Sequence, residues 1–269
     1  MSPLSILCIG DIVGRPGRQL LIQKLAEIQD EHNIDFTIAN LENAASGFGI
    51  TKKTYAELAG LSIQAFTSGN HIYAQRDSLS YFDSFTKLVR PLNYPPNSPG
   101  VGVRSFSTNG TSIAIVNLIG QVFMAPVDCP FQAITNCLDT LKKENDIVIV
   151  DFHTEATSEI QAMGWHLTEK ASCVFGTHTH VMTADDHILD DYTAYISDIG
   201  MVGSGNSILG MEKSAILSQF TTHISCRKKP SLLPPYIFNA IKIDVDPKTG
   251  QALSIKRIQK SFSKLRNLE

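Results

Sequence analysis

Short apolar runs alternate with segments of helical periodicity along the chain, and this alternation predicts the order of its strands and helices. The apolar runs predict strands over residues 4–9, 36–39, 63–67, 101–106, 112–117, 147–151, 172–175, 193–196, 238–245 and 252–258. Apolar residues three or four positions apart predict helices from Pro16 through Ile28 and over residues 51–59, 77–89, 129–142 and 158–170. Strands that alternate with helices are typical of an α/β fold.

One long segment, residues 90–100, is rich in proline and must be irregular. It could link two domains, but strand patterns resume directly after it, which favours a long surface loop. The two apolar runs after residue 237 resemble a closing hairpin around residues 246–250. We therefore expect a single α/β domain over residues 1–269, with a mixed sheet or two packed sheets.

Composition narrows the class of protein further. The 269 residues include 23 Lys+Arg and 26 Asp+Glu, and 43% are hydrophobic, which excludes disorder for most of the chain. The near-neutral charge argues against stable binding of duplex nucleic acid. No apolar run is long enough to cross a membrane, and the N-terminus lacks a secretory signal pattern. Five scattered cysteines without a CxxC pair fit the reducing cytoplasm.

Candidate chemistry lies just past the apolar runs. Five of the predicted strands are followed by side chains that bind metals: Asp11, Glu42 with Asn43, Asn70 with His71, His153, and His178 with His180. In α/β folds the carboxyl ends of strands converge on one edge of the sheet, where ligands bind. We therefore expect these residues, which are far apart in the sequence, to lie close together.

These residue types suit two divalent metal ions, because they offer anionic oxygen, amide oxygen and neutral nitrogen. The set contains no cysteine, which argues against a structural zinc site. Glu42 is the natural carboxylate to bridge two metals. Two such ions and two carboxylates leave about two positive charges to hold a hydroxide and a phosphate, the arrangement of two-metal phosphoryl chemistry.

Each of these residues also has an ordinary explanation. Asp11 could be a helix cap or turn residue, Glu42 a solvated loop residue, and His153 a buried, hydrogen-bonded histidine. Five such positions in one chain rarely arise independently, so the combination favours the metal site. Surface roles are expected for the remaining candidates, His32, His166, His187 and His223.

The segment Gly14–Arg18 resembles a phosphate cradle at a helix N-terminus. It lacks the full Walker pattern, so a strand-to-helix turn is favoured. Hydrolysis by a nucleophilic serine is unsupported, because no Gly-x-Ser-x-Gly elbow occurs.

Taken together, the motifs resemble those of the calcineurin-like metallophosphoesterases, most closely the bacterial YmdB-type branch. The matching segments are residues 9–18, 42–45, 69–71, 90–95, 151–159, 176–181 and 198–201, so that the resemblance spans nearly the whole chain. Val13 stands where the wider superfamily has a histidine, and Glu42 stands where it has the bridging aspartate. Both departures fit the YmdB branch.

This resemblance implies a four-layer α-β-β-α sandwich, two mixed β-sheets flanked by helices, with a dinuclear site at the sheet edge. It implies self-association as a dimer or tetramer and iron or manganese as the metals, although zinc shares these ligands. It implies His71 as general acid and two ligand sets that share Glu42. One set is Asp11, Glu42, Asn43 and His180, and the other is Glu42, Asn70, His153 and His178.

The leading hypothesis is a cytoplasmic dinuclear phosphodiesterase that acts on small phosphodiesters such as 2′,3′-cyclic nucleotides. In this hypothesis a metal-activated hydroxide attacks phosphorus, and His71 protonates the leaving oxygen. Two alternatives remain open: a nucleotide-binding regulatory protein with incidental turnover, and a phosphomonoesterase.

Overall fold

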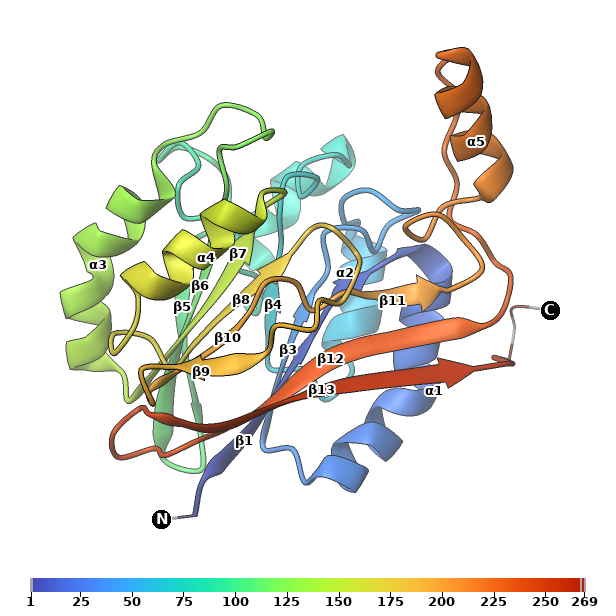
Figure 1. The fold of residues 1–269 in the computed structure, drawn as a ribbon. Coiled ribbons are helices and arrows are strands. Elements are labelled where there is room, and N and C mark those ends of the chain that lie inside the picture. Colours follow the sequence, from blue (N-terminus) through green and yellow to red (C-terminus); the bar gives the residue numbers. More distant parts are fainter. Residues whose placement is uncertain (1, 267, 269) are drawn as a thin grey trace.

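The computed structural model describes residues 2–266 and 268, and its strands form two sheets packed against each other (Figure 1). The first sheet runs in the order β2, β11, β12, β1, β3, β4, and β13 pairs with β12. The strands of this sheet are β1 (Leu4–Ile9), β2 (Asp11–Ile12), β3 (Phe36–Asn40), β4 (Ala65–Thr67), β11 (Met201–Ser204), β12 (Tyr236–Val245) and β13 (Ala252–Phe262).

The second sheet runs in the order β5, β6, β7, β8, β10, β9. Its strands are β5 (Val103–Thr108), β6 (Thr111–Ile119), β7 (Ile147–His153), β8 (Cys173–Thr177), β9 (His187–Leu189) and β10 (Thr193–Ile196). The helices are α1 (Gly14–His32), α2 (Lys52–Ala59), the 3₁₀ helix η1 (Arg76–Ser84), α3 (Pro130–Glu144), α4 (Thr157–His166) and α5 (Lys213–Thr222). No helix among the described residues is both long and apolar enough to span a membrane.

Three apolar cores stack these elements into four layers. The central core joins the inner faces of the two sheets, with Phe36 of β3 and Phe175 of β8 among its fully buried side chains. A second core packs α1 and α2 on the outer face of the first sheet, and a third packs α3 and α4 on the outer face of the second. The predicted α-β-β-α sandwich with two mixed sheets is confirmed (Figure 1).

Strand direction decides where the loops gather. In the first sheet β1, β3 and β4 are parallel neighbours, so their carboxyl ends lie at one edge. In the second sheet β6, β7, β8 and β10 are likewise parallel. The segments that follow β3, β4, β7 and β8 therefore emerge from the carboxyl edges of the two sheets, which is where ligands bind in α/β folds.

One predicted helix is wrong. The structure has only the 3₁₀ helix Arg76–Ser84 where a helix over residues 77–89 was expected, and the chain then becomes extended. Val89 N donates to Phe66 O, and Leu88 forms a bridge with Phe66, so this end of the segment pairs with β4. Phe82 and Phe85, three residues apart, pack into the core in the tighter 3₁₀ spacing.

The capping signal at the start of α2 predicted this helix correctly, unlike the apolar spacing over residues 77–89. Thr51 caps α2 as predicted, because its Oγ1 accepts from Thr54 N at 3.1 Å. Short elements without a clear period, β2, β9, β11 and α5, were not predicted, and α4 ends at His166 rather than at residue 170.

Replacing Phe36 with alanine tests the central core. Phe36 is 1% exposed and contacts the Phe106 ring edge-on at 5.9 Å between centroids. We expect Phe36→Ala to lower the free energy of unfolding by about 3–5 kcal/mol, because it leaves a cavity between the sheets. Urea denaturation measures this loss. Phe123→Ala, at a residue that is 88% exposed, is the control and should change stability by less than about 0.5 kcal/mol.

Candidate metal centre

The structure brings together every residue that the sequence placed at a strand end. Asp11 begins β2, and Glu42 and Asn43 follow β3. Asn70 and His71 follow β4, His153 ends β7, and His178 and His180 follow β8. Both sheets contribute, so the cluster lies where the two sheets meet.

One group of contacts converges on His153. Its Nε2 lies 3.2 Å from Glu42 Oε1, 3.0 Å from Asn70 Oδ1 and 3.1 Å from His178 Nδ1. The ligand atoms of Glu42, His153 and His178 all lie within 4.8 Å of one another. Four polar atoms directed at one point in this way can surround a single cation.

A second group gathers around His180. Its Nε2 lies 3.3 Å from Asn43 Oδ1 and 3.9 Å from Asp11 Oδ1. The other Asp11 oxygen accepts from His178 N at 3.2 Å, which ties this group to the first. The contacts fall into two groups, and the division of the ligands between two metals that the resemblance implies stays a prediction, with Glu42 as the member expected to belong to both sets.

Two buried carboxylate oxygens test whether metal ions fit here. Asp11 and Glu42 are 0% and 1% exposed, yet Asp11 Oδ1 accepts no hydrogen bond from the described residues, and the contact that Glu42 Oε1 makes is with another member of the cluster, His153 Nε2. A buried, unpartnered carboxylate oxygen is costly, and buried charges are normally paired or coordinate metals. The surrounding donors are oxygen and imidazole nitrogen, which suit divalent transition metals. The residues therefore fit a metal centre.

The pKa values show how strongly these groups perturb one another. Burial raises the pKa of Asp11 well above its usual range, an effect that nearby Glu42 increases. For Glu42 burial acts in the same direction, but the charge and hydrogen bond of His153 outweigh it and lower the pKa to about 2. Burial lowers the pKa of His153, but Glu42 outweighs that effect and raises it to about 9. A cation bound beside Glu42 would replace this imidazolium proton.

Burial favours the neutral form of the two other histidines of the cluster, His178 and His180. Burial, reinforced by the charge of His153, lowers the pKa of His178 to about 3. Burial also lowers the pKa of His180. Neutral imidazole is the form that ligates metals, so both rings are prepared as ligands.

A second layer of buried polar residues, which the sequence analysis did not assign to the site, holds the ligands in place. His153 Nδ1 lies 2.9 Å from Thr177 Oγ1, which donates to Asp151 Oδ1 at 2.7 Å. Asn40 Nδ2 donates to the other Asp151 oxygen at 3.2 Å, and Glu42 N donates to Asn40 Oδ1 at 3.1 Å. Their signal was present in the sequence, because each is a polar residue inside an otherwise apolar strand. Such partners orient metal ligands.

The backbone around the cluster is constrained as well. His178 and His180 have φ angles of 110° and 63°, which non-glycine residues rarely adopt. Strained residues of this kind persist where the surrounding structure holds them, and they concentrate at functional sites. At Gly69 a β-carbon would overlap Glu42 Oε2 and His153 Nε2, so only glycine lets this loop pass so close to the ligands.

His71 lies at the edge of the cluster. Its backbone N donates to Glu42 Oε2 at 3.0 Å, and its ring meets the Phe48 ring edge-on at 4.9 Å between centroids. Burial lowers the pKa of His71. Its side chain lines a cavity of about 320 Å³ together with Glu42, Asn43, His178 and His180. His71 can therefore reach a molecule bound in front of the ligands.

The weaker candidates lie elsewhere. Residues 14–18 form the first turn of α1 directly after β2, as the strand-to-helix interpretation expected. His187 and His223 are exposed and do not contact the cluster.

The layers, the convergent histidines and the buried carboxylates define a metallophosphoesterase-like protein. Residues 7–258 match the model of the YmdB-like protein family, and the chain belongs to that family. It is 39% identical over 255 residues to the 2′,3′-cyclic-nucleotide 2′-phosphodiesterase of Bacillus subtilis, and the match covers 95% of this chain and 96% of that protein.

Two solved structures share the fold along nearly their whole length. A hypothetical protein from Thermus thermophilus superposes with a TM-score of 0.90 and 34% identity, over 96% of this chain and 100% of that one. A protein described as a novel phosphatase of Mycoplasma pneumoniae superposes with a TM-score of 0.91 and 30% identity, over 97% and 95% of the two chains.

Adding one methyl group at Gly69 tests the metal centre. We expect Gly69→Ala to bind less metal than the unaltered protein, because the new β-carbon displaces Glu42 or His153. Elemental analysis of the purified, metal-loaded proteins measures the stoichiometry. Gly60→Ala is the matched control, since a β-carbon there makes only ordinary contacts and φ is −75°. Full metal content in Gly69→Ala would show that this loop does not face the ions.

Proposed function

We propose that the protein is a dinuclear phosphodiesterase that hydrolyses small phosphodiesters of the 2′,3′-cyclic nucleotide type. The observation that carries this proposal is the pair of buried carboxylates among metal-competent histidine and asparagine side chains: Asp11 Oδ1 accepts no hydrogen bond from the described residues, and Glu42 Oε1 faces the His153 ring nitrogen at 3.2 Å. The Bacillus subtilis relative named for this activity, which matches nearly the whole chain, supports the choice of substrate.

In this proposal the ligands divide as the two contact groups do. Asp11, Asn43 and His180 would hold one ion, Asn70, His153 and His178 would hold the other, and Glu42 would belong to both sets. Bound ions of this kind activate water and stabilise charge at phosphorus. Iron or manganese suits these ligands, and zinc shares them. Because the ligands extend from residue 11 to residue 180 and β12 and β13 complete the first sheet, we treat residues 1–269 as one functional unit.

The proton for the leaving oxygen is assigned to His71. This side chain lines the cavity in front of the ligands, and its backbone bond to Glu42 sets its distance from them. Burial lowers its pKa, which makes its protonated form a stronger acid. In the structure His71 Nε2 lies 3.5 Å from the Asn70 amide nitrogen, from which a neutral ring can accept a hydrogen bond.

A phosphomonoesterase is the second candidate, because the Mycoplasma pneumoniae structure is described as a phosphatase. A panel of substrates separates the two. We expect the metal-loaded protein to hydrolyse 2′,3′-cyclic nucleotides faster than nucleoside monophosphates, and to lose this activity in excess chelator. Release of phosphate from monoesters at the higher rate would favour the phosphatase. Nucleotide binding without product under iron, manganese or zinc would indicate a regulatory binding protein.

A substitution at His71 separates proton donation from metal binding. We expect His71→Asn to keep its metal content and to lower kcat about 10²–10⁴-fold, the usual contribution of a positioned acid. His223→Asn is the matched control, because His223 is exposed at the end of α5 and has a φ of 57°, which asparagine accepts. Loss of metal in His71→Asn would assign His71 to the ligands instead.

A further inference from the structure

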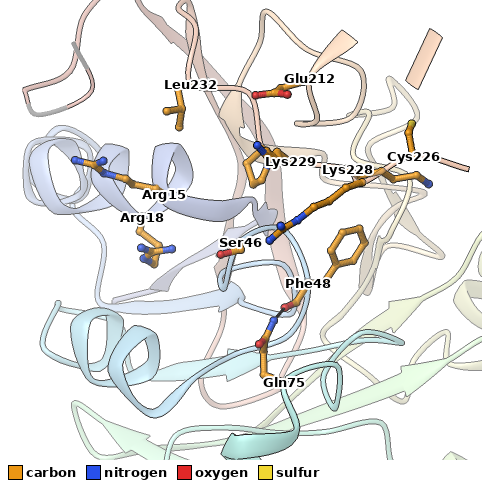
Figure 2. A pocket seen from close by; sticks show the side chains of 12 residues that line it. Arg15, Arg18, Ser46, Phe48, Gln75, Glu212, Cys226, Lys228, Lys229 and Leu232 are labelled. Carbon is orange, nitrogen blue, oxygen red and sulfur yellow. Dashed lines mark hydrogen bonds between the residues drawn. The ribbon is translucent and has the colours of Figure 1, made fainter. Parts of the chain in front are cut away.

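A second cavity, larger than the one in front of the metal ligands, shares lining residues with it. Figure 2 shows the side chains that line this second cavity. Its volume is about 970 Å³, near the upper end of the range for small-molecule sites. Figure 2 shows Arg15 and Arg18 on the side of α1, with Lys228 and Lys229 contributed by the segment that follows α5. Nothing in the two ligand groups or in the role of His71 uses this cavity.

The charge of this cavity is unusual for the chain. Arg15, Arg18, Arg227, Lys228 and Lys229 line it, and Glu212 is the only acidic side chain among its lining residues. The whole sequence carries more acidic than basic residues, so this concentration of cations does not reflect the average surface. Five cations around one hollow fit an anion of the phosphate type.

The basic side chains of this cavity differ in whether they already form ion pairs within the protein. Arg18 is held by the protein, since its Nε pairs with Glu57 at 2.7 Å and its Nη1 donates to Ala44 O at 2.5 Å. By contrast, Arg227, Lys228 and Lys229 form no ion pair with a carboxylate of the described residues, 2–266 and 268. Their charges are therefore available to a ligand, while Arg18 has a fixed position in the wall.

Two residues connect this cavity to the metal centre. Phe48 and Lys228 line both cavities. Phe48 presents an aromatic ring beside His71, and aromatic rings of this kind stack with nucleobases. A ligand held at the metal ligands can thus continue past Phe48 into the cationic cavity.

We propose that the cationic cavity binds a second phosphate group of the substrate, beyond the phosphodiester that is cleaved. This inference rests on the proposed function, and it makes the preferred substrate a nucleotide with two phosphate groups. The second phosphate can be a terminal 5′-phosphate or the internucleotide phosphate of a short single-stranded RNA that ends in a cyclic phosphate. Both offer anionic phosphate oxygens to Arg227, Lys228 and Lys229.

Binding measurements test the second-phosphate site without relying on turnover. We expect the metal-loaded protein to bind adenosine 3′,5′-bisphosphate about tenfold more tightly than adenosine 3′-monophosphate, the contribution of one charge-assisted hydrogen bond. Arg227→Gln with Lys229→Gln should remove this preference. Lys143→Gln, at an exposed lysine of α3, is the matched control and should retain it. Titration calorimetry measures the affinity of each protein for each ligand.

Kinetics then distinguish the two sources of the phosphate. We compare kcat/KM for a nucleoside 2′,3′-cyclic phosphate, its 5′-phosphorylated form, and a dinucleotide that ends in a cyclic phosphate. A gain for the 5′-phosphorylated form alone assigns the cavity to a terminal phosphate, and a gain for the dinucleotide assigns it to an RNA chain. The gain in kcat/KM should weaken as the salt concentration rises. In a plot of log(kcat/KM) against log salt concentration, the slope should be steeper by about 0.7 per contacted phosphate than for the substrate without that phosphate.

Equal affinities for the bisphosphate and the monophosphate would overturn the second-phosphate site, as would an unchanged preference in the double variant. Neither result depends on whether the protein hydrolyses the simple cyclic nucleotide. Failure of that hydrolysis would contradict the proposed function and leave the binding comparison intact as a separate test.

Discussion

The site depends on one electrostatic constraint, the burial of Asp11 and Glu42 at the junction of two sheets. Each side chain is withdrawn from water, and Asp11 keeps an oxygen that accepts no hydrogen bond from the described residues. Burial of such a charge is unfavourable unless a cation compensates it. His153 supplies part of that compensation as a protonated partner of Glu42, which raises the pKa of His153 to about 9. Full compensation requires more positive charge than this one side chain offers, and metal ions would provide it.

This constraint explains why so much buried polar structure surrounds the ligands. Thr177, Asp151 and Asn40 form a hydrogen-bonded chain behind His153 and Glu42, and all three are fully buried. Such a network fixes the ring of His153 in one orientation. Gly69 and the left-handed backbone of His178 contribute in another way, because they bring the loops of the two sheets within contact distance. The geometry of the ligands is therefore set by residues that would never touch a substrate.

Much of this arrangement could be predicted from the sequence, because periodicity and strand-end chemistry are local signals. The strands that end at His153 and near His178 were predicted from apolar runs, and the capping residue Thr51 from its type. The helix expected over residues 77–89 failed because its apolar residues pack in a 3₁₀ turn and then beside β4, which only tertiary contacts decide. Asp151 was missed as a supporting residue for a similar reason. Its partners come from β3 and β8, which are distant in the sequence.

The net charge of the chain conceals an uneven distribution of charge around the candidate site. Carboxylates occupy the interior of the cluster, where metal ions would more than neutralise them, while Arg227, Lys228 and Lys229 line the adjoining cavity. The net charge of −3 counts only the side chains, so it shows neither this cluster of cations nor any charge that bound metal ions would add. A local field of this kind attracts anions toward one location. A near-neutral total is therefore compatible with strong local selection for phosphate, and Lys228, which borders both cavities, is where the two positive regions join.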